Sequence, residues 1–305
     1  MTAATTKSPG IRSRLVNGIL AIKPLANLAK HQAREMMIKR AEDMGVPWRE
    51  SVAKLRTRDW DSELAAVQNP NLTYPEYYLR SFHAYENGNL NWDAALEVEF
   101  AAYAVHSKLW EDAGKKGDAM LRQSYHDVLL AQLPIQPQNI LDLGCGVGMS
   151  TMALQEIYPQ AKLTGVDLSP YFITVAHYRS EQQQTDITWK HAAAEATGLA
   201  DESFDLVSAC LMFHELPQQP SREIFAEARR LLTSGGYLTI MDMNPRSQVY
   251  ATMPPYILTL LKSTEPYLDK YFAFDIAQAI MDAGFEEPTI TCNTVRHRTI
   301  IARAK

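Results

Sequence analysis

The chain has 305 residues, of which 46% are hydrophobic and 21% are charged, a composition typical of a folded globular protein. It contains no apolar run near the ~20 residues that a bilayer-spanning helix needs, and the segment from Met1 to Arg14 lacks the apolar centre of a secretory signal. The three cysteines, Cys145, Cys210 and Cys292, have no metal-binding spacing, so we expect reduced thiols and a cytoplasmic location.

The net charge of −5 is unevenly distributed along the chain. Residues 1–60 carry a balance of +7, and the remaining residues carry −12. Such a basic segment either docks onto the acidic remainder or makes a peripheral contact with a membrane surface. A nucleic-acid partner is not expected, because the body of the chain is acidic and no mixed basic and aromatic pattern appears.

The first third of the chain shows helical periodicity separated by turn signals. Between the helical stretches lies a segment from Tyr74 to Trp92 that is rich in aromatic residues yet too polar for a buried helix. We predict that residues 1–117 form a helical cap over the mouth of a substrate site. The predicted helices span 11–44, 48–56, 91–113 and 117–133.

After Pro137 the periodicity changes to alternating strands and helices joined by short connections. This alternation predicts an α/β fold with a doubly wound, mainly parallel seven-stranded sheet, and a final hairpin makes the last strand antiparallel. The predicted strands span 139–143, 162–167, 187–191, 204–211, 236–243, 287–293 and 298–302, and the predicted helices 150–158, 170–181, 220–232 and 274–283.

Two motifs stand at the ends of the first two strands of this unit. The first strand ends in Asp142 and is followed by glycine at 144, 146 and 148, and the second ends in Asp167. Closely spaced glycines let a backbone turn sharply and approach a ligand. The pattern resembles the cofactor loop of class I S-adenosylmethionine-dependent methyltransferases, of the broad small-molecule group that includes ubiquinone and menaquinone C-methyltransferases. The resemblance covers residues 118–305 and includes a substrate lid at about 243–274.

The resemblance implies S-adenosylmethionine as the cofactor and assigns roles to the motif residues. Asp142 would hold the methionine amino group, the loop of Gly144, Gly146 and Gly148 would pass close to the methionine and ribose, Asp167 would bind the ribose hydroxyls, and Leu168 would pack on the adenine. The alternative without a ligand is a tight turn plus an ordinary helix cap. A nicotinamide dinucleotide is disfavoured, because its fingerprint needs a small residue where Met149 stands.

Other expected site residues follow the third and fourth strands. Family members often carry an adenine-binding acid at the position of Ala193, so adenine would depend on backbone groups there or on Glu195. Leu211 is also assigned to the cofactor site. His214 is either a general base, since an imidazole titrates near pH 6.5, or merely the start of the next helix. No metal site is expected, because the histidines are scattered in the sequence.

The substrate is expected to be a small lipophilic or aromatic molecule that is methylated on oxygen or carbon. Its walls would come from the cap, through Tyr78, His83 and Tyr85, and from the lid, through Tyr250 and Tyr256. The alternative for these side chains is core packing between lid and sheet. A non-catalytic S-adenosylmethionine-binding scaffold or sensor remains a second hypothesis, and a protein methyltransferase is disfavoured.

Overall fold

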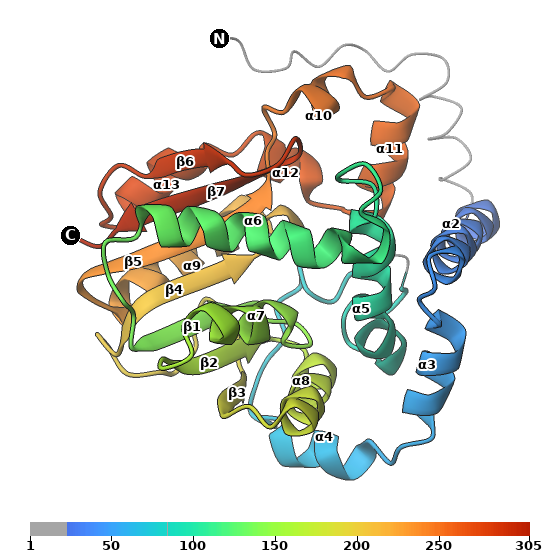
Figure 1. Ribbon diagram of the computed structural model, residues 1–305, viewed down its shortest axis with the longest axis horizontal. Helices are drawn as coiled ribbons and strands as arrows, with labels where there is room; N and C mark the ends of the chain where they lie inside the picture. Colours follow the sequence, from blue (N-terminus) through green and yellow to red (C-terminus); the bar gives the residue numbers. More distant parts are fainter. Residues whose placement is uncertain (1–22, 84) are drawn as a thin grey trace.

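The structure is a computed structural model in which residues 23–83 and 85–305 are described. Its centre is a seven-stranded sheet with the strand order β3-β2-β1-β4-β5-β7-β6. The strands are β1 (Asn139–Leu143), β2 (Lys162–Asp167), β3 (Ile187–His191), β4 (Phe204–Cys210), β5 (Leu232–Met243), β6 (Thr289–Cys292) and β7 (His297–Arg303). Figure 1 shows the sheet running through the molecule from β3 to β6.

The strand directions match the prediction from the sequence. β1 pairs in parallel with β2 and β4, β2 with β3, and β4 with β5, whereas β7 runs antiparallel to both β5 and β6. The chain order of the strands reverses between β1 and β4, which is the switch point where open α/β sheets bind ligands. The loops after β1, β2, β4 and β5 therefore meet at one edge of the sheet, at the carboxyl ends of the strands.

Helices cover both faces of the sheet, because residues of one strand alternate between two buried clusters. In β1, Ile140 packs in the cluster with α6 and α7, whereas Leu141 and Leu143 pack in the cluster with α9 and α13. Parallel strands buried on both faces require such double coverage. The core helices are α6 (Gly117–Gln132), α7 (Met149–Ile157), α8 (Pro170–Gln183), α9 (Gln218–Leu231) and α13 (Ile276–Asp282).

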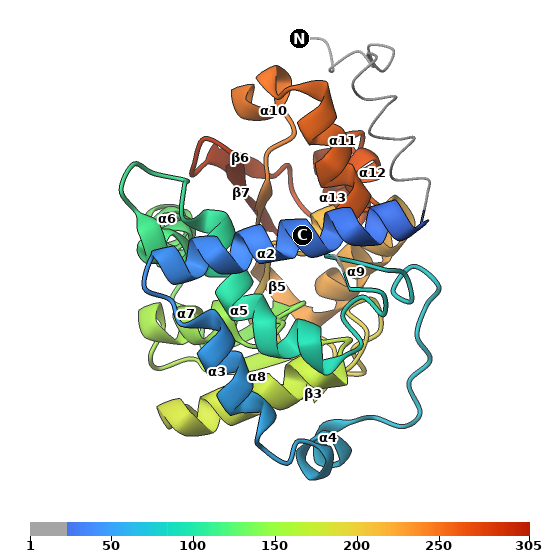
Figure 2. The same cartoon turned by 90° about the vertical axis from the view of Figure 1, so that its right-hand side faces the viewer.

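The N-terminal helices lie beside the carboxyl ends of the parallel strands, toward which the arrowhead of β4 points in Figure 1. Figure 2 looks onto this side, where α2 crosses in front of α5. Trp48 and Trp60 from this region pack in one buried cluster with Val147, Phe172 and Val175 of the core. The N-terminal helices are α2 (Lys23–Asp43), α3 (Trp48–Arg56), α4 (Asp61–Val67) and α5 (Trp92–His106).

Basic side chains of the first helices are neutralised within this region. Arg34 on α2 forms an ion pair with Glu97 of α5, and Arg56 on α3 forms one with Asp93 of α5. Glu97 is 1% exposed, so its pairing with Arg34 fastens α2 to α5 in a buried setting. These pairs are the kind of contact that the docking interpretation of the basic segment requires.

The structure differs from the predicted elements in a few places. The helix predicted over 91–113 ends at His106, and the chain beyond it turns, with left-handed φ values of 57° at Asp112 and 50° at Gly114. The segment 243–274 contains three short helices, α10 (Gln248–Thr252), α11 (Pro255–Thr264) and α12 (Leu268–Phe272). Helix α4 was not predicted, and the predicted helical stretch before residue 23 lies outside the described residues. Within the described ranges, no helix has the length and apolar character needed to cross a bilayer.

Candidate functional site

The loop between β1 and α7 has the conformation that its three glycines permit. Gly144, Gly146 and Gly148 have φ values of 65°, 55° and 83°, a region that side chains with a Cβ rarely enter. A Cβ at Gly144 would lie 2.5 Å from Met212 Sδ, and a Cβ at Gly148 would lie 2.6 Å from the Trp189 ring. These two glycines are therefore required by both conformation and packing.

The middle glycine is placed differently. The nearest described atom to a Cβ built on Gly146 is a ring carbon of Phe172 at 3.9 Å, so this side of the loop has room for a ligand. The Gly146 N–H donates a hydrogen bond to Asp167 Oδ2 at 2.8 Å. The loop after β1 and the acid at the end of β2 therefore form one unit.

Asp142 lies fully buried beneath the glycine loop. Its Oδ2 accepts hydrogen bonds from the Ser150 hydroxyl at 2.6 Å and the Thr151 hydroxyl at 2.7 Å. Its Oδ1 is buried and has no partner among residues 23–83 and 85–305. Burial raises the pKa of the Asp142 carboxyl to about 6, against the effect of the two hydroxyl hydrogen bonds. An orphaned buried acceptor is costly, and a cationic amino group of a ligand would satisfy it.

Asp167 is the second acid of the site and is 8% exposed. Besides the bond from Gly146, its Oδ1 accepts the Ser169 N–H at 2.8 Å. Burial raises the pKa of Asp167 to about 6, and these backbone hydrogen bonds act in the opposite direction. A carboxylate can accept about four hydrogen bonds, so Asp167, which is bonded by the backbone of Gly146, Leu168 and Ser169, retains capacity for a ligand hydroxyl. The acids, the open side of Gly146 and the orphaned Oδ1 of Asp142 together fit S-adenosylmethionine.

The remaining predicted cofactor residues lie around the ends of β2, β3 and β4. Leu168 is buried, and its carbonyl accepts a hydrogen bond from His191 Nε2 at 3.0 Å. Ala193 is half-buried in a bridge with Ala196, and Glu195 Oε1 accepts the Tyr77 hydroxyl at 2.7 Å. A residue of the N-terminal region therefore contacts the segment after β3.

Leu211 begins the segment after β4 with a φ of 57°, an uncommon conformation for a residue with a side chain. Its N–H donates to the carbonyl of Met241 at 2.8 Å, which keeps the end of β4 tied to β5. The backbone turns at this point, and the turn leads directly to His214.

His214 is paired with an acid that the sequence analysis missed. The ring nitrogen Nδ1 of His214 lies 2.7 Å from Asp242 Oδ1, and the backbone N–H of His214 donates to Asp242 Oδ2 at 3.2 Å. Asp242 is 0% exposed and is the last residue but one of β5. It follows an apolar run, which gives no sequence signal for a functional acid. Burial alone would lower the pKa of His214, but the carboxylates of Asp242, Glu265 and Glu215 together outweigh it and raise the pKa to about 10. These carboxylates therefore favour the protonated form of the His214 imidazole.

The segment before α5 and the segment after α11 bring two more titratable side chains, His83 and Glu265, to His214. His83 Nε2 lies 2.9 Å from Glu265 Oε1 and 3.5 Å from Glu215 Oε1, and His214 Nε2 lies 4.0 Å from the same Glu215 oxygen. The backbone N–H of His83 also donates to the carbonyl of Thr264 at 3.2 Å. The surrounding protein lowers the pKa of His83, but Glu265 and Glu215 outweigh this effect and raise it to about 8. The segments that carry His83, His214 and Glu265 thus meet in one polar cluster.

The predicted substrate residues divide between this cluster and other surroundings. Tyr78 lies near both Asp167 and Glu215, and its pKa is raised by burial first and then by these carboxylates. Tyr250 packs against Phe272 with ring centroids 5.3 Å apart. Tyr256 is half-buried on α11.

Tyr85 differs from the expectation. Its hydroxyl donates to Glu97 Oε2 at 2.7 Å, in the buried contact with Arg34, and its ring packs in the cluster of the N-terminal helices. The buried carboxylate of Glu97 needs both donors, so the Tyr85 hydroxyl serves the packing of the cap. We therefore assign Tyr85 to the cap, not to the group of side chains around His214.

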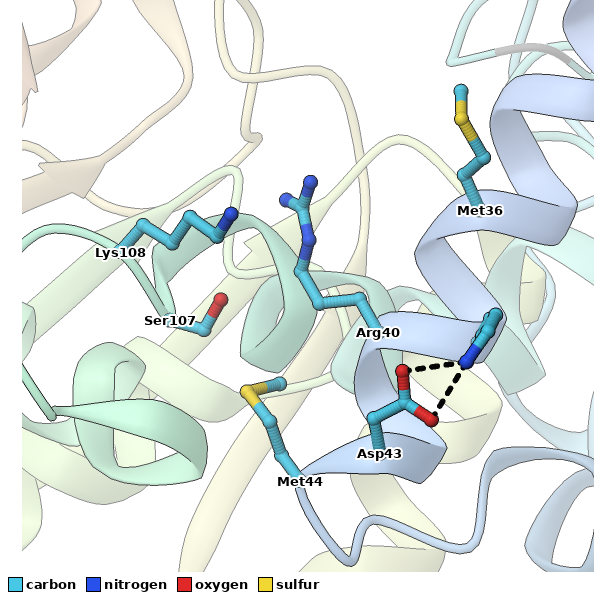
Figure 3. Close-up of a pocket in the computed structure, with 7 residues that line it drawn as sticks. Met36, Arg40, Asp43, Met44, Ser107 and Lys108 are labelled. Carbon is cyan, nitrogen blue, oxygen red and sulfur yellow. Dashed lines mark hydrogen bonds and ion pairs between the residues drawn. The ribbon is translucent and has the colours of Figure 1, made fainter.

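A separate hollow of about 380 Å³ lies between α2 and the segment after α5. Figure 3 shows Arg40 and Lys108 extending toward the same space, with the ion pair of Asp43 at the side. None of the residues that line this hollow belongs to the strands or to the loops that follow them. The hollow is therefore distinct from the site at the carboxyl ends of the strands.

Comparisons with known proteins agree with this geometry. Residues 140–236 match a family described as a methyltransferase domain. Malonyl-[acyl-carrier protein] O-methyltransferase of Hahella chejuensis is 38% identical over 104 residues, which cover 33% of this chain and 35% of that protein. Ubiquinone biosynthesis O-methyltransferase of Coxiella burnetii is 27% identical over 187 residues, which cover 60% of this chain and 78% of that protein.

A solved structure supports the fold. Phosphoethanolamine N-methyltransferase 2 of Haemonchus contortus, in complex with phosphomonomethylethanolamine and S-adenosylhomocysteine, is 14% identical. It covers 71% of this chain and 60% of that one with a TM-score of 0.52. The chain spans about a third of the Hahella relative and more than three quarters of the Coxiella relative.

The strand order, the glycine loop and the family match define a Rossmann-like methyltransferase fold. Residues 140–236 form a methyltransferase domain, and its cofactor is S-adenosylmethionine.

Proposed function

We propose that this protein transfers a methyl group from S-adenosylmethionine to a hydroxyl oxygen of a small lipophilic or aromatic molecule. The observation that carries the proposal is that the glycine loop with its two acids and the His214 cluster lie at the same edge of the sheet. Tyr78 connects the two parts, since it lies near both Asp167 and Glu215. Oxygen as the acceptor atom is supported by the names of the Hahella and Coxiella relatives, both of which are O-methyltransferases.

The cofactor would be held by Asp142, by the backbone around Gly146, and by Asp167. When bound, it supplies an electrophilic methyl group, whose carbon–sulfur bond breaks as the carbon–oxygen bond forms, with the electron pair kept by sulfur. The protein's main contribution is alignment of the acceptor, and such positioning contributes on the order of 7–11 kcal/mol to lowering a barrier. Asp142 and Asp167 orient the cofactor from opposite ends of the glycine loop.

His214 is the residue proposed to contact the acceptor oxygen. Its ring orientation is set by Asp242 on Nδ1, which leaves Nε2 toward Glu215 and the side chains that come from the cap and lid. The proton lost by the acceptor hydroxyl would pass to a carboxylate of this cluster, Glu215 or Glu265. The geometry thus provides both an orienting group and proton acceptors where the hydroxyl is expected.

Residues 1–117 are proposed to act as a cap over the substrate mouth, with residues 118–305 as the catalytic core and about 243–274 as the lid. Contacts between these parts support the proposal: the Ser169 hydroxyl donates to the carbonyl of Asn89 at 2.7 Å, and the Tyr267 hydroxyl of the lid donates to the carbonyl of Tyr77 at 3.3 Å. Tyr78, Tyr250 and Tyr256 would supply apolar walls between the cap and the lid.

Methyl transfer can be tested with the full chain, S-adenosylmethionine and an extract of small metabolites. The expected result is release of S-adenosylhomocysteine together with a metabolite heavier by one methylene and carrying the group on oxygen. A product methylated on carbon would keep the enzyme assignment but overturn the hydroxyl acceptor. Tight cofactor binding with no turnover on any fraction would favour the non-catalytic scaffold or sensor.

A further inference from the structure

Two histidines and one glutamate converge in a way that the scattered sequence positions do not reveal. One ligand atom from each of His83, His214 and Glu265 lies within 4.8 Å of the others. His83 comes from the cap, His214 follows β4, and Glu265 follows α11 of the lid. Imidazole nitrogen and carboxylate oxygen in this two-to-one ratio form a common ligand set for divalent transition metals.

The surroundings of His214 support a metal site. The Nδ1 of His214 lies 2.7 Å from Asp242 Oδ1, and Asp242 is itself 0% exposed. Metal-ligating histidines commonly donate their second N–H to a carboxylate, which fixes the ring and leaves the other nitrogen for the ion. The pairing with Asp242 therefore presents Nε2 of His214 to the cluster.

Glu265 provides an independent observation. Glu265 is 7% exposed, and its Oε2 is buried with no hydrogen-bond partner in the described part of the chain. Its Oε1 lies 2.9 Å from His83 Nε2, so the carboxylate is directed into the cluster. A buried carboxylate oxygen without a donor is costly, and a cation at this point would satisfy it.

We propose that His83, His214 and Glu265 bind one divalent transition-metal ion of the Zn²⁺ type. Ligand atoms around a tetrahedral zinc ion lie about 3.3 Å apart, and the three ligand atoms here already lie within 4.8 Å of one another. Glu215, whose Oε1 lies 3.5 Å from His83 Nε2 and 4.0 Å from His214 Nε2, is positioned as an additional oxygen donor. Imidazole ligands favour such an ion over Mg²⁺.

The ion would deepen the proposed function, and this role rests on that function. It would join the cap, the core and the lid at the place assigned to the acceptor hydroxyl. A bound divalent ion lowers the pKa of a coordinated hydroxyl, which would favour loss of the acceptor proton at neutral pH. Metal binding itself requires neither the cofactor nor turnover and can be measured separately.

The test uses tag-free full-length protein after treatment with a chelator. Co²⁺ is titrated by visible absorption, and Zn²⁺ by calorimetry; both are expected to bind with a stoichiometry of one per chain. Glu265→Gln, which keeps the shape of the side chain, and His83→Ala should each weaken binding at least tenfold. Asp242→Asn should weaken it about 10- to 100-fold, as loss of a partner of a ligating histidine does.

His177→Ala is the matched control. His177 Nδ1 lies 3.6 Å from Glu181 on the exposed side of α8, so this pair has similar chemistry without the converging third side chain. The control should bind the metal as the wild type does. Melting temperature and S-adenosylmethionine affinity are measured for every variant, so that loss of folding is separated from loss of a ligand.

Lack of stoichiometric binding by the wild type would overturn the metal site, and so would equal affinity in a folded Glu265→Gln variant. Cofactor calorimetry separates this result from the proposed function. Protein that binds S-adenosylmethionine but no metal would contradict only the metal site. Protein that binds the metal but not the cofactor would contradict the proposed methyl transfer.

Discussion

The backbone N–H of Gly146 donates a hydrogen bond to Asp167 Oδ2 at 2.8 Å, which joins the glycine loop to the acid at the end of β2. The same carboxylate accepts the N–H of Ser169 through its other oxygen. Asp167 therefore both organises the loop and offers its remaining acceptor capacity to a ligand. Changes at this residue should affect cofactor binding more than the sheet, because its side chain is outside the buried apolar clusters.

Replacing Asp167 with alanine is expected to weaken S-adenosylmethionine binding about ten- to a hundredfold. The lost hydrogen bonds to a charged acceptor correspond to roughly 1.5–3 kcal/mol. Calorimetry of the cofactor and its demethylated product measures the effect. Asp186→Ala, which removes an exposed carboxylate before β3, serves as the control. Equal affinities in the Asp167 variant and the wild type would place the ribose contact elsewhere.

Cofactor affinity should fall as the pH is lowered through about 6. Burial raises the pKa values of both Asp142 and Asp167 to about 6, and the cofactor needs the ionised carboxylates as acceptors. Below that pH, binding must expel a proton from each carboxyl that ionises, at about tenfold in affinity per pH unit and per group. Dissociation constants between pH 5 and pH 8 should show this slope, with a smaller one in Asp167→Asn. A flat profile in the wild type would contradict the linkage.

The same raised pKa values have the opposite effect on the protein without its cofactor. A carboxyl whose pKa is higher in the folded state than in the unfolded state stabilises the fold most below the unfolded value of about 4. This contribution is lost as the pH rises through about 6. The wild type should therefore lose stability relative to Asp167→Asn as the pH rises from about 4 to about 6. Denaturant titration of both proteins measures this difference.

Replacing His214 with alanine should lower turnover by roughly 10²–10⁴ and leave S-adenosylmethionine affinity nearly unchanged. The reason is that His214 is placed on the acceptor side of the site, whereas the cofactor is assigned to the loop at Gly146. Single-turnover rates and cofactor calorimetry on one preparation measure both quantities. If the surviving folded protein turned over at a near-normal rate, His214 would have only a structural role.

The ion pair between Arg34 and Glu97 should contribute more to stability than the one between Lys39 and Asp43. Glu97 is 1% exposed and bonded to both Arg34 and Tyr85, whereas Lys39 and Asp43 are exposed. We expect Arg34→Ala to lower the free energy of unfolding by about 1.5–3 kcal/mol, since a buried carboxylate loses its cationic partner. Lys39→Ala should change it by less than about 0.5 kcal/mol. Denaturant titration compares the two, and equal effects would argue against the role of Glu97 in fastening α2.

The core of the fold could be predicted because its signals are local. Each β strand and its following helix carry their own hydrophobic period, and the short connections leave a doubly wound sheet as the consistent arrangement. The loop of Gly144 to Gly148 and the acid Asp167 also have fixed spacing along the chain. The class of cofactor follows from the family resemblance that those residues carry.

The acceptor side of the site depended on tertiary packing. His83, Asp242 and Glu265 are far apart in the sequence, and the segments that carry His83 and Glu265 have no regular period from which a direction could be inferred. Tyr85 shows the converse, since its aromatic neighbourhood suggested a substrate contact while the buried Glu97 holds its hydroxyl in the cap. The direction of a side chain in an irregular segment is decided by the packing partners and buried charges around it. These partners come together only when the cap and the lid fold against the core.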